Sequence, residues 1–423
     1  MGVKAKRKLL QNIDNLDQPL RFNPFVFSRS FLLWAFVGIV GGIIAGAYWI
    51  VLEFLTHGLH TINDWKVIPL MTLTGLMVGL IIKWIGDPGE IHLIVNNIKF
   101  KNGKLNPKLN PSMILTSLLC VSSGGSLGPE APLVQVTGST ATWIGKIFRL
   151  KGEELRSLSI AGMASGFTAL FGAPLGGSLF SQEILHHKYT TQYYKSTIPA
   201  LVASCFSFVI FAIIVHLGLG PTWKLTSYTY SDPFDFLLAI GFAVIATFVG
   251  WIFIFITKNL KTILEGLKLP IFLLTTLGGL GLGIISYYFP ITRYFGHHEI
   301  NELLEKDLLI SGLFTILIFK IIAIAITVTT GWRGGFIIPL FFVGTTLGLL
   351  LHQYIPNIDL SLIVVSCMAA INVCVTRTPV STTILLVTLT GFGHFIPILF
   401  ASLTGYFLAP KIPFIKTQIR REK

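Results

Sequence analysis

One stretch of this chain concentrates residues that could do chemistry: Ser122-Ser-Gly-Gly-Ser-Leu-Gly-Pro-Glu-Ala-Pro132 carries a single carboxylate, Glu130, in a turn rich in Gly and Pro. Apolar sequence lies on both sides of the turn, and a carboxylate at membrane depth is costly and usually functional. Pro129 suits the first turn of a helix, so we expect a new helix to begin at Glu130. The free N–H groups at such a helix start bind anions. A carboxylate on an anion site predicts a gate that competes with a transported ion.

The composition places this turn in a membrane protein. The chain has 423 residues, of which 52% are hydrophobic and 12% are charged, whereas soluble domains carry roughly 25% charged residues. The first apolar run, Phe31 to Leu55, is long enough to span a bilayer, and no cleavable signal pattern precedes it. We therefore predict an all-α, polytopic membrane protein.

The formal net charge is +13, and its distribution favours a membrane over a nucleic acid as the partner. The cations gather at the termini and in short loops, which marks those parts as cytoplasmic. We expect residues 1–30 to be a cytoplasmic N-terminal segment, 31–410 the transmembrane domain, and 411–423 a basic cytoplasmic tail. This orientation fits the inner membrane of a prokaryotic cell with both termini inside, and no nucleic-acid partner is predicted.

The apolar segments are uneven in length, and several are too short to span. A helix of 14 residues is about 21 Å long, while the hydrocarbon core is about 30 Å thick. Because Lys108 and Lys146 both read as cytoplasmic, the chain between them must enter the membrane and return at the Gly124–Pro132 turn. Irregular backbone at that depth is tolerated only inside protein or beside a cavity. The apolar segments are 31–55, 67–85, 112–125, 130–147, 157–185, 197–217, 235–257, 270–289, 309–330, 335–352, 361–376 and 380–409.

The two halves of the chain, about 31–217 and 235–410, repeat weakly. In the first half a Gly-rich turn ends at Pro132, and Met163 and Ala173-Pro174 follow; in the second, Gly331-Trp-Arg-Gly-Gly-Phe-Ile-Ile-Pro339 precedes Met368 and Thr378-Pro379. The separation from Met to Pro is the same in both halves. Gly/Pro-interrupted segments in corresponding positions point to a transport site between inverted repeats of tilted, broken helices.

With these motifs in order, the chain resembles the CLC family of chloride channels and proton/chloride antiporters. The family's Gly-Lys/Arg-Glu-Gly-Pro turn corresponds to Gly128-Pro-Glu-Ala-Pro132. Its Gly-x-Phe-x-Pro turn is similar to Gly334-Gly-Phe-Ile-Ile-Pro339, where the Phe is one place early and Ile337 takes its position. The resemblance implies a homodimer with one pathway per subunit. It also implies that Glu130 is the gating glutamate and that the two turns bind the anion, through Gly128, Ala131, Gly335, Phe336, Ile337 and Ile338.

The departures from the family pattern concern the anion site and the proton route. By alignment the pore serine is replaced by Gly86 and the pore tyrosine by Phe392, so two hydroxyl donors are missing. Ile184 stands where antiporters often carry an inner glutamate. Glu183, His186 and His187 are alternative proton acceptors, since His titrates in the useful range. The plainer interpretation makes Glu183 a membrane-edge charge and the two histidines interface residues.

The sequence therefore predicts transmembrane movement of chloride or another small anion, as a channel or as an antiporter that also carries protons. A fluoride/proton antiporter or an exporter of another halide is the alternative. Arg333 and Arg377 could attract the anion or simply pair with a carboxylate or with carbonyls. An intramembrane metalloenzyme built on Glu183, His186 and His187 is a remote alternative, because no His-Glu-x-x-His pattern accompanies them. No metal and no cofactor are predicted.

Overall fold

A computed structural model of the chain describes residues 28–89, 105–185, 195–216, 220–226, 233–415 and 418. Apart from one isolated bridge between two turns, the regular structure of these residues is helical. Seven of the described helices are long and apolar enough to cross a membrane. The predicted class, an all-α polytopic membrane protein, is confirmed.

The first half of the chain contributes long outer helices and a set of shorter ones that end inside the protein. The predicted start of a helix at Glu130 is found, with Pro129 as the residue just before it. The helices are α2 (Arg29–His60), α3 (Val67–Ile85), α5 (Asn110–Ser122), α6 (Glu130–Ile147), α7 (Gly152–Phe171), α8 (Pro174–Glu183) and α10 (Thr197–Val215), with short 3-10 turns at Asp64–Lys66 and Pro107–Leu109.

The second half follows a similar order. Its Gly-rich turn precedes a helix that begins at Ile337, as the turn before α6 precedes Glu130. The helices are α11 (Phe234–Gly266), α12 (Ile271–Tyr288), α13 (Glu299–Glu305), α14 (Ile310–Thr329), α15 (Ile337–Tyr354), α16 (Leu360–Thr376), α17 (Pro379–Thr390) and α18 (Phe395–Leu408), with 3-10 turns at Pro290–Thr292 and Phe392–His394.

Two apolar segments that look continuous in the sequence are each broken into two helices. Residues 157–185 divide between α7 and α8, where Gly172 adopts a left-handed conformation with φ of 62° and Pro174 starts the next helix. Residues 380–409 divide between α17 and α18 around the 3-10 turn that begins at Phe392. Apolar composition alone could not locate these breaks, because both helices of each pair are apolar.

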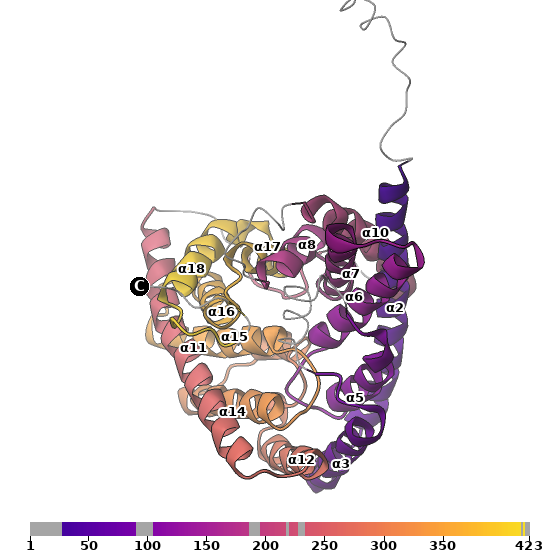
Figure 1. Ribbon diagram of the computed structural model, residues 1–423. Coiled ribbons are helices and arrows are strands. Elements are labelled where there is room, and N and C mark those ends of the chain that lie inside the picture. Colours follow the sequence, from indigo (N-terminus) through magenta and orange to yellow (C-terminus); the bar gives the residue numbers. More distant parts are fainter. Residues whose placement is uncertain are drawn as a thin grey trace, which may run out of the picture.

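The two halves lie face to face (Figure 1), with α5 to α8 on one side and α14 to α17 on the other. The helices α3 and α12 pack together across the halves, as do α8 and α17. At the first of these contacts Gly79 and Gly279 bring the backbones close, since a Cβ at either would overlap the other helix. Small residues commonly allow such close packing between membrane helices.

Candidate functional site

The Gly-rich turns of the two halves are joined by their backbones. The N–H of Gly128 donates to the carbonyl of Gly335 over 2.8 Å, and the N–H of Gly335 donates to the carbonyl of Gly128 over 2.6 Å. This pair places the start of α6 beside the start of α15. Gly128 and Gly335 were expected to help bind the anion; their N–H groups are used in this pair, and anion binding at the two glycines stays a prediction.

The Glu130 side chain lies between these two turns. Its exposed fraction is 1%, and its Oε1 accepts a hydrogen bond of 3.0 Å from the N–H of Ile338 in the first turn of α15. Its Oε2 is buried without a partner. A Cβ at either Gly128 or Gly335 would overlap the carboxylate, so the two glycines leave the space that it fills.

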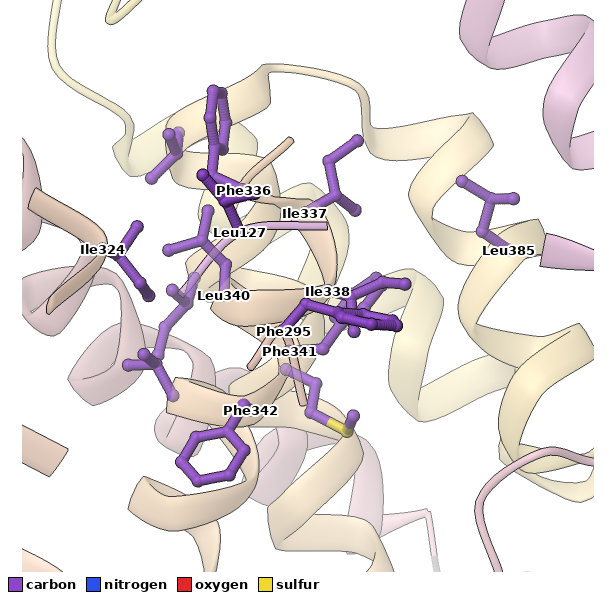
Figure 2. Packing of buried hydrophobic residues seen from close by; sticks show 14 of the residues in the cluster. Leu127, Phe295, Ile324, Phe336, Ile337, Ile338, Leu340, Phe341, Phe342 and Leu385 are labelled. Carbon is purple, nitrogen blue, oxygen red and sulfur yellow. The ribbon is translucent and has the colours of Figure 1, made fainter. Parts of the chain in front are cut away.

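The remaining first-turn donors face the same region. In α6 these are the N–H groups of Glu130 and Ala131, and in α15 those of Phe336 and Ile337. None of them has an intrahelical carbonyl to bind, because they lie at the start of a helix. Figure 2 shows Phe336, Ile337 and Ile338 together at the start of α15. Two helix N-termini therefore meet at one point, which favours negative charge there.

A cavity of about 130 Å³ lies beside Glu130, along the seam where the starts of α6 and α15 meet. It has room for roughly four water molecules, at about 30 Å³ for each, or for one halide ion and a few waters. Ala131, Phe336 and Ile337 line it, as predicted for the anion-binding turns. Three basic side chains and one carboxylate contribute to the wall: Arg333, Lys258, Lys261 and Glu130.

Four predicted anion-binding positions do not line the cavity: Gly86, Gly128, Ile338 and Phe392. The carbonyl of Gly86 accepts a hydrogen bond of 2.7 Å from the Ser112 hydroxyl. The nearby Gly89, and not Gly86, lines the cavity. Phe392 has a side chain that is 84% exposed and lies in the turn between α17 and α18. The expectations for Gly86 and Phe392 came from an alignment by spacing, and the structure places both residues outside the cavity wall.

The structure brings in an aromatic residue that the sequence reasoning missed. Phe414 lines the cavity and packs edge-on against Phe336, with their ring centroids 5.5 Å apart. It follows the last long helix in a stretch without regular periodicity, so no pattern in the sequence singled it out. The cavity therefore has an aromatic wall, but this ring carries no hydroxyl.

Glu183 is placed away from the cavity wall. Its Oε1 accepts from the N–H of Val380 over 3.1 Å, and its Oε2 accepts from the N–H and the hydroxyl of Ser381 over 2.8 and 2.6 Å. The carboxylate thus caps the N-terminus of α17, while its neighbour Ile184 lines the cavity. His186 and His187 lie outside the described residues. A proton route through these three residues stays a prediction.

The two arginines considered in the sequence both have partners. Arg333 Nη2 lies 2.6 Å from Asp87 Oδ1, and Arg377 donates from Nη2 to the carbonyls of Pro410 and Lys411. Of the two, only Arg333 lines the cavity. Among the described residues, no group of three or more His, Cys, Asp or Glu side chains could hold a metal ion.

A fully buried lysine outside the cavity supports the backbone around Thr292 and Tyr294. Lys320, in the middle of α14, donates to the carbonyls of Thr292 and Tyr294 over 3.0 and 2.8 Å, and its Nζ lies 4.4 Å from the ring centroid of Phe342. The adjoining Arg293 donates to the Ser123 carbonyl from both Nε and Nη2. A lone charge inside an apolar helix is the signal that could have drawn attention to Lys320.

An all-helical membrane protein whose repeats bring two helix N-termini and a carboxylate to a single seam is built to handle anions inside the bilayer. The chain belongs to the voltage-gated chloride channel family, whose sequence profile matches residues 74–410. It is therefore an anion-transport protein and not an enzyme, and the predicted family is confirmed.

Relatives and solved structures agree with this assignment. The chain is 28% identical over 372 residues to an uncharacterized protein of Methanocaldococcus jannaschii, covering 88% of this chain and 90% of that protein. It is 27% identical over 363 residues to a protein of Ralstonia nicotianae provisionally named a ClcB-like chloride channel protein, covering 82% of each.

Two solved structures share the fold. One is a CLC-type fluoride/proton antiporter, with a TM-score of 0.82 and 20% identity, covering 94% of this chain and 99% of that one. The other is a slow cyanobacterial Cl⁻/H⁺ antiporter, with a TM-score of 0.79 and 18% identity, covering 90% and 94%. At this identity the likeness establishes the fold alone.

Proposed function

We propose that the protein moves a small monovalent anion, chloride in the first instance, through the cavity between its two halves, and that the Glu130 carboxylate is the gate. One observation carries the proposal: Oε1 of Glu130 accepts the hydrogen bond of the Ile338 N–H. That donor belongs to the helix N-terminus where an anion would bind. The carboxylate and the anion then compete for one place.

The geometry supports a gate that moves rather than a fixed cap. The charged carboxylate has a single hydrogen bond from another residue, while its second oxygen is buried without a partner. An anion arriving from the cavity can replace it at the helix N-terminus. Protonation removes the charge that the helix N-terminus favours. Either event releases the side chain and opens the pathway, so flux should rise as the pH falls.

Exchange of fluoride for protons is the second candidate. The observation that favours it is the fold, which is shared with a CLC-type fluoride/proton antiporter. We further propose a homodimer with both termini in the cytoplasm, as the family resemblance and the basic loops suggest.

The test is anion efflux from proteoliposomes loaded with chloride or fluoride, with the internal pH recorded at the same time. In Glu130→Gln we expect flux that is open and insensitive to pH. An unchanged pH dependence in this variant would remove Glu130 from the gate. Proton movement driven uphill by the anion gradient identifies an antiporter, and anion flux without it identifies a channel.

A further inference from the structure

Arg333 lines the cavity and carries a buried hydrogen-bond donor that has no partner. The residue is 4% exposed and lines the cavity, and its Nε is buried without a hydrogen-bond partner. A buried polar group without a partner is costly, so such groups in folded proteins call for an explanation. An anion in the cavity would supply the missing acceptor.

The backbone around Arg333 is firmly anchored. Its N–H contacts the Cys120 sulfur at 3.4 Å, and the indole N–H of the preceding Trp332 donates to the carbonyl of Thr275 over 3.0 Å. Two residues later, Gly335 is bound to Gly128. The guanidinium therefore starts from a fixed base, which reduces the entropy lost when it binds a ligand.

Asp87 leaves much of the arginine charge uncompensated at the cavity. The ion pair joins Nη2 to Oδ1 over 2.6 Å, but the Asp87 side chain is 59% exposed whereas that of Arg333 is 5% exposed. The same carboxylate oxygen also accepts from the N–H of Gly89 over 2.8 Å. Water screens the exposed carboxylate more than the buried guanidinium, and a guanidinium has five N–H donors, of which Asp87 takes one.

We propose that Arg333 is an anion ligand, whose Nε–H binds a halide-sized monovalent anion in the cavity while Nη2 stays paired with Asp87. The inference rests on the proposed function, because the same cavity serves as the pathway. Arg333 supplies a donor in a wall to which Gly89 and Phe414 contribute no hydroxyl. Its charge adds to that of Lys258 and Lys261 on the same wall.

Binding is measured directly, by calorimetric titration of chloride, bromide and fluoride into purified protein in a buffer of large organic anions. Three proteins are compared: wild type, Arg333→Lys and Asp87→Asn. Lysine keeps the positive charge but removes the Nε–H, and asparagine breaks the ion pair but leaves the guanidinium. We expect Arg333→Lys to bind the anion at least about tenfold more weakly, since a hydrogen bond to a charged partner is lost. Asp87→Asn should bind as tightly as wild type or more tightly.

Two outcomes would overturn the inference. If Arg333→Lys binds like wild type, only the charge matters and the Nε–H is no ligand. If Asp87→Asn loses as much affinity as Arg333→Lys, the ion pair is merely structural. Crystals of the wild-type protein in bromide give an answer that needs no variant: we expect an anomalous peak beside the Arg333 side chain, and bromide bound only elsewhere refutes it. The titration and the bromide crystals measure binding and not flux, so a failure of the Glu130→Gln flux test leaves this result readable.

Discussion

The proposed gate can be tested without changing the Glu130 carboxylate, through the slot between Gly128 and Gly335 that the carboxylate fills. The structure indicates the substitution Gly128→Ala. The three atoms nearest to an added Cβ there are the carboxylate atoms of Glu130, all within 3.0 Å. The backbone at Gly128 is outside the left-handed region, so alanine is accepted without strain. The overlap is removed most easily if the flexible Glu130 side chain moves its carboxylate out of the slot.

The displaced carboxylate loses its hydrogen bond to the Ile338 N–H. A hydrogen bond to a charged group contributes about 1.5–3 kcal/mol, so the balance between closed and open gate should shift by a factor of about 10 to 150. Flux near neutral pH should rise, and its increase on acidification should shrink accordingly. The effect resembles that of Glu130→Gln, although the carboxylate is still present.

The assay is anion flux from proteoliposomes at mildly acid and at neutral pH. Gly312→Ala is the matched control, because a Cβ at Gly312 in α14 meets nothing within 4 Å and should leave the flux unchanged. The double variant Gly128→Ala/Glu130→Gln should behave like Glu130→Gln alone. A folded Gly128→Ala protein with the wild-type ratio of acid to neutral flux would refute the reasoning, since the carboxylate would then not depend on the slot.

Three further predictions follow from contacts described above. Glu183→Gln removes the charge that caps the N-terminus of α17 and should destabilise the protein by about 1 kcal/mol, seen as a lower Tm in detergent; an unchanged Tm would contradict the cap. Phe414→Tyr places a hydroxyl in the cavity wall and should raise chloride affinity about tenfold, measured by titration, whereas equal affinities would show that the ring does not reach the anion. Burial lowers the pKa of His297 to about 4 from 6.5. Between these values the folded state binds fewer protons than the unfolded state, so the free energy of unfolding should decrease as the pH is lowered from about 6.5 to about 4, by up to about 3 kcal/mol. The Tm of His297→Phe should fall less over the same range, and an equal fall in both proteins would sink this assignment.

The helix that starts at Glu130 could be predicted from the sequence because Gly and Pro act locally. They end one helix and permit the next whatever packs around them, so the turn before α6 was identified without knowing its neighbours. The second Gly-rich turn was found for the same reason. The family also followed from these motifs, since their order along the chain is preserved.

What the sequence could not reveal is which groups satisfy one another across the seam. The backbone pair between Gly128 and Gly335 was not foreseen, because each residue's partner lies in the other half of the chain. Phe392 was chosen by counting back from a proline, but Phe414 reaches the cavity from a segment that has no periodic pattern. The ion pair of Arg333 with Asp87 likewise joins residues far apart in sequence. Such contacts depend on how the halves dock, which local propensity does not determine.

The pair of backbone hydrogen bonds between Gly128 and Gly335 also bears on how the protein is made. During synthesis the first Gly-rich turn enters the membrane long before the second has left the ribosome. Until the second half inserts and docks, Gly128 lacks its partner, α15 offers no donor to Glu130, and the cavity has only one wall. If the cavity is the pathway, as proposed, a chain that ends before α15 should therefore carry no anion across the membrane.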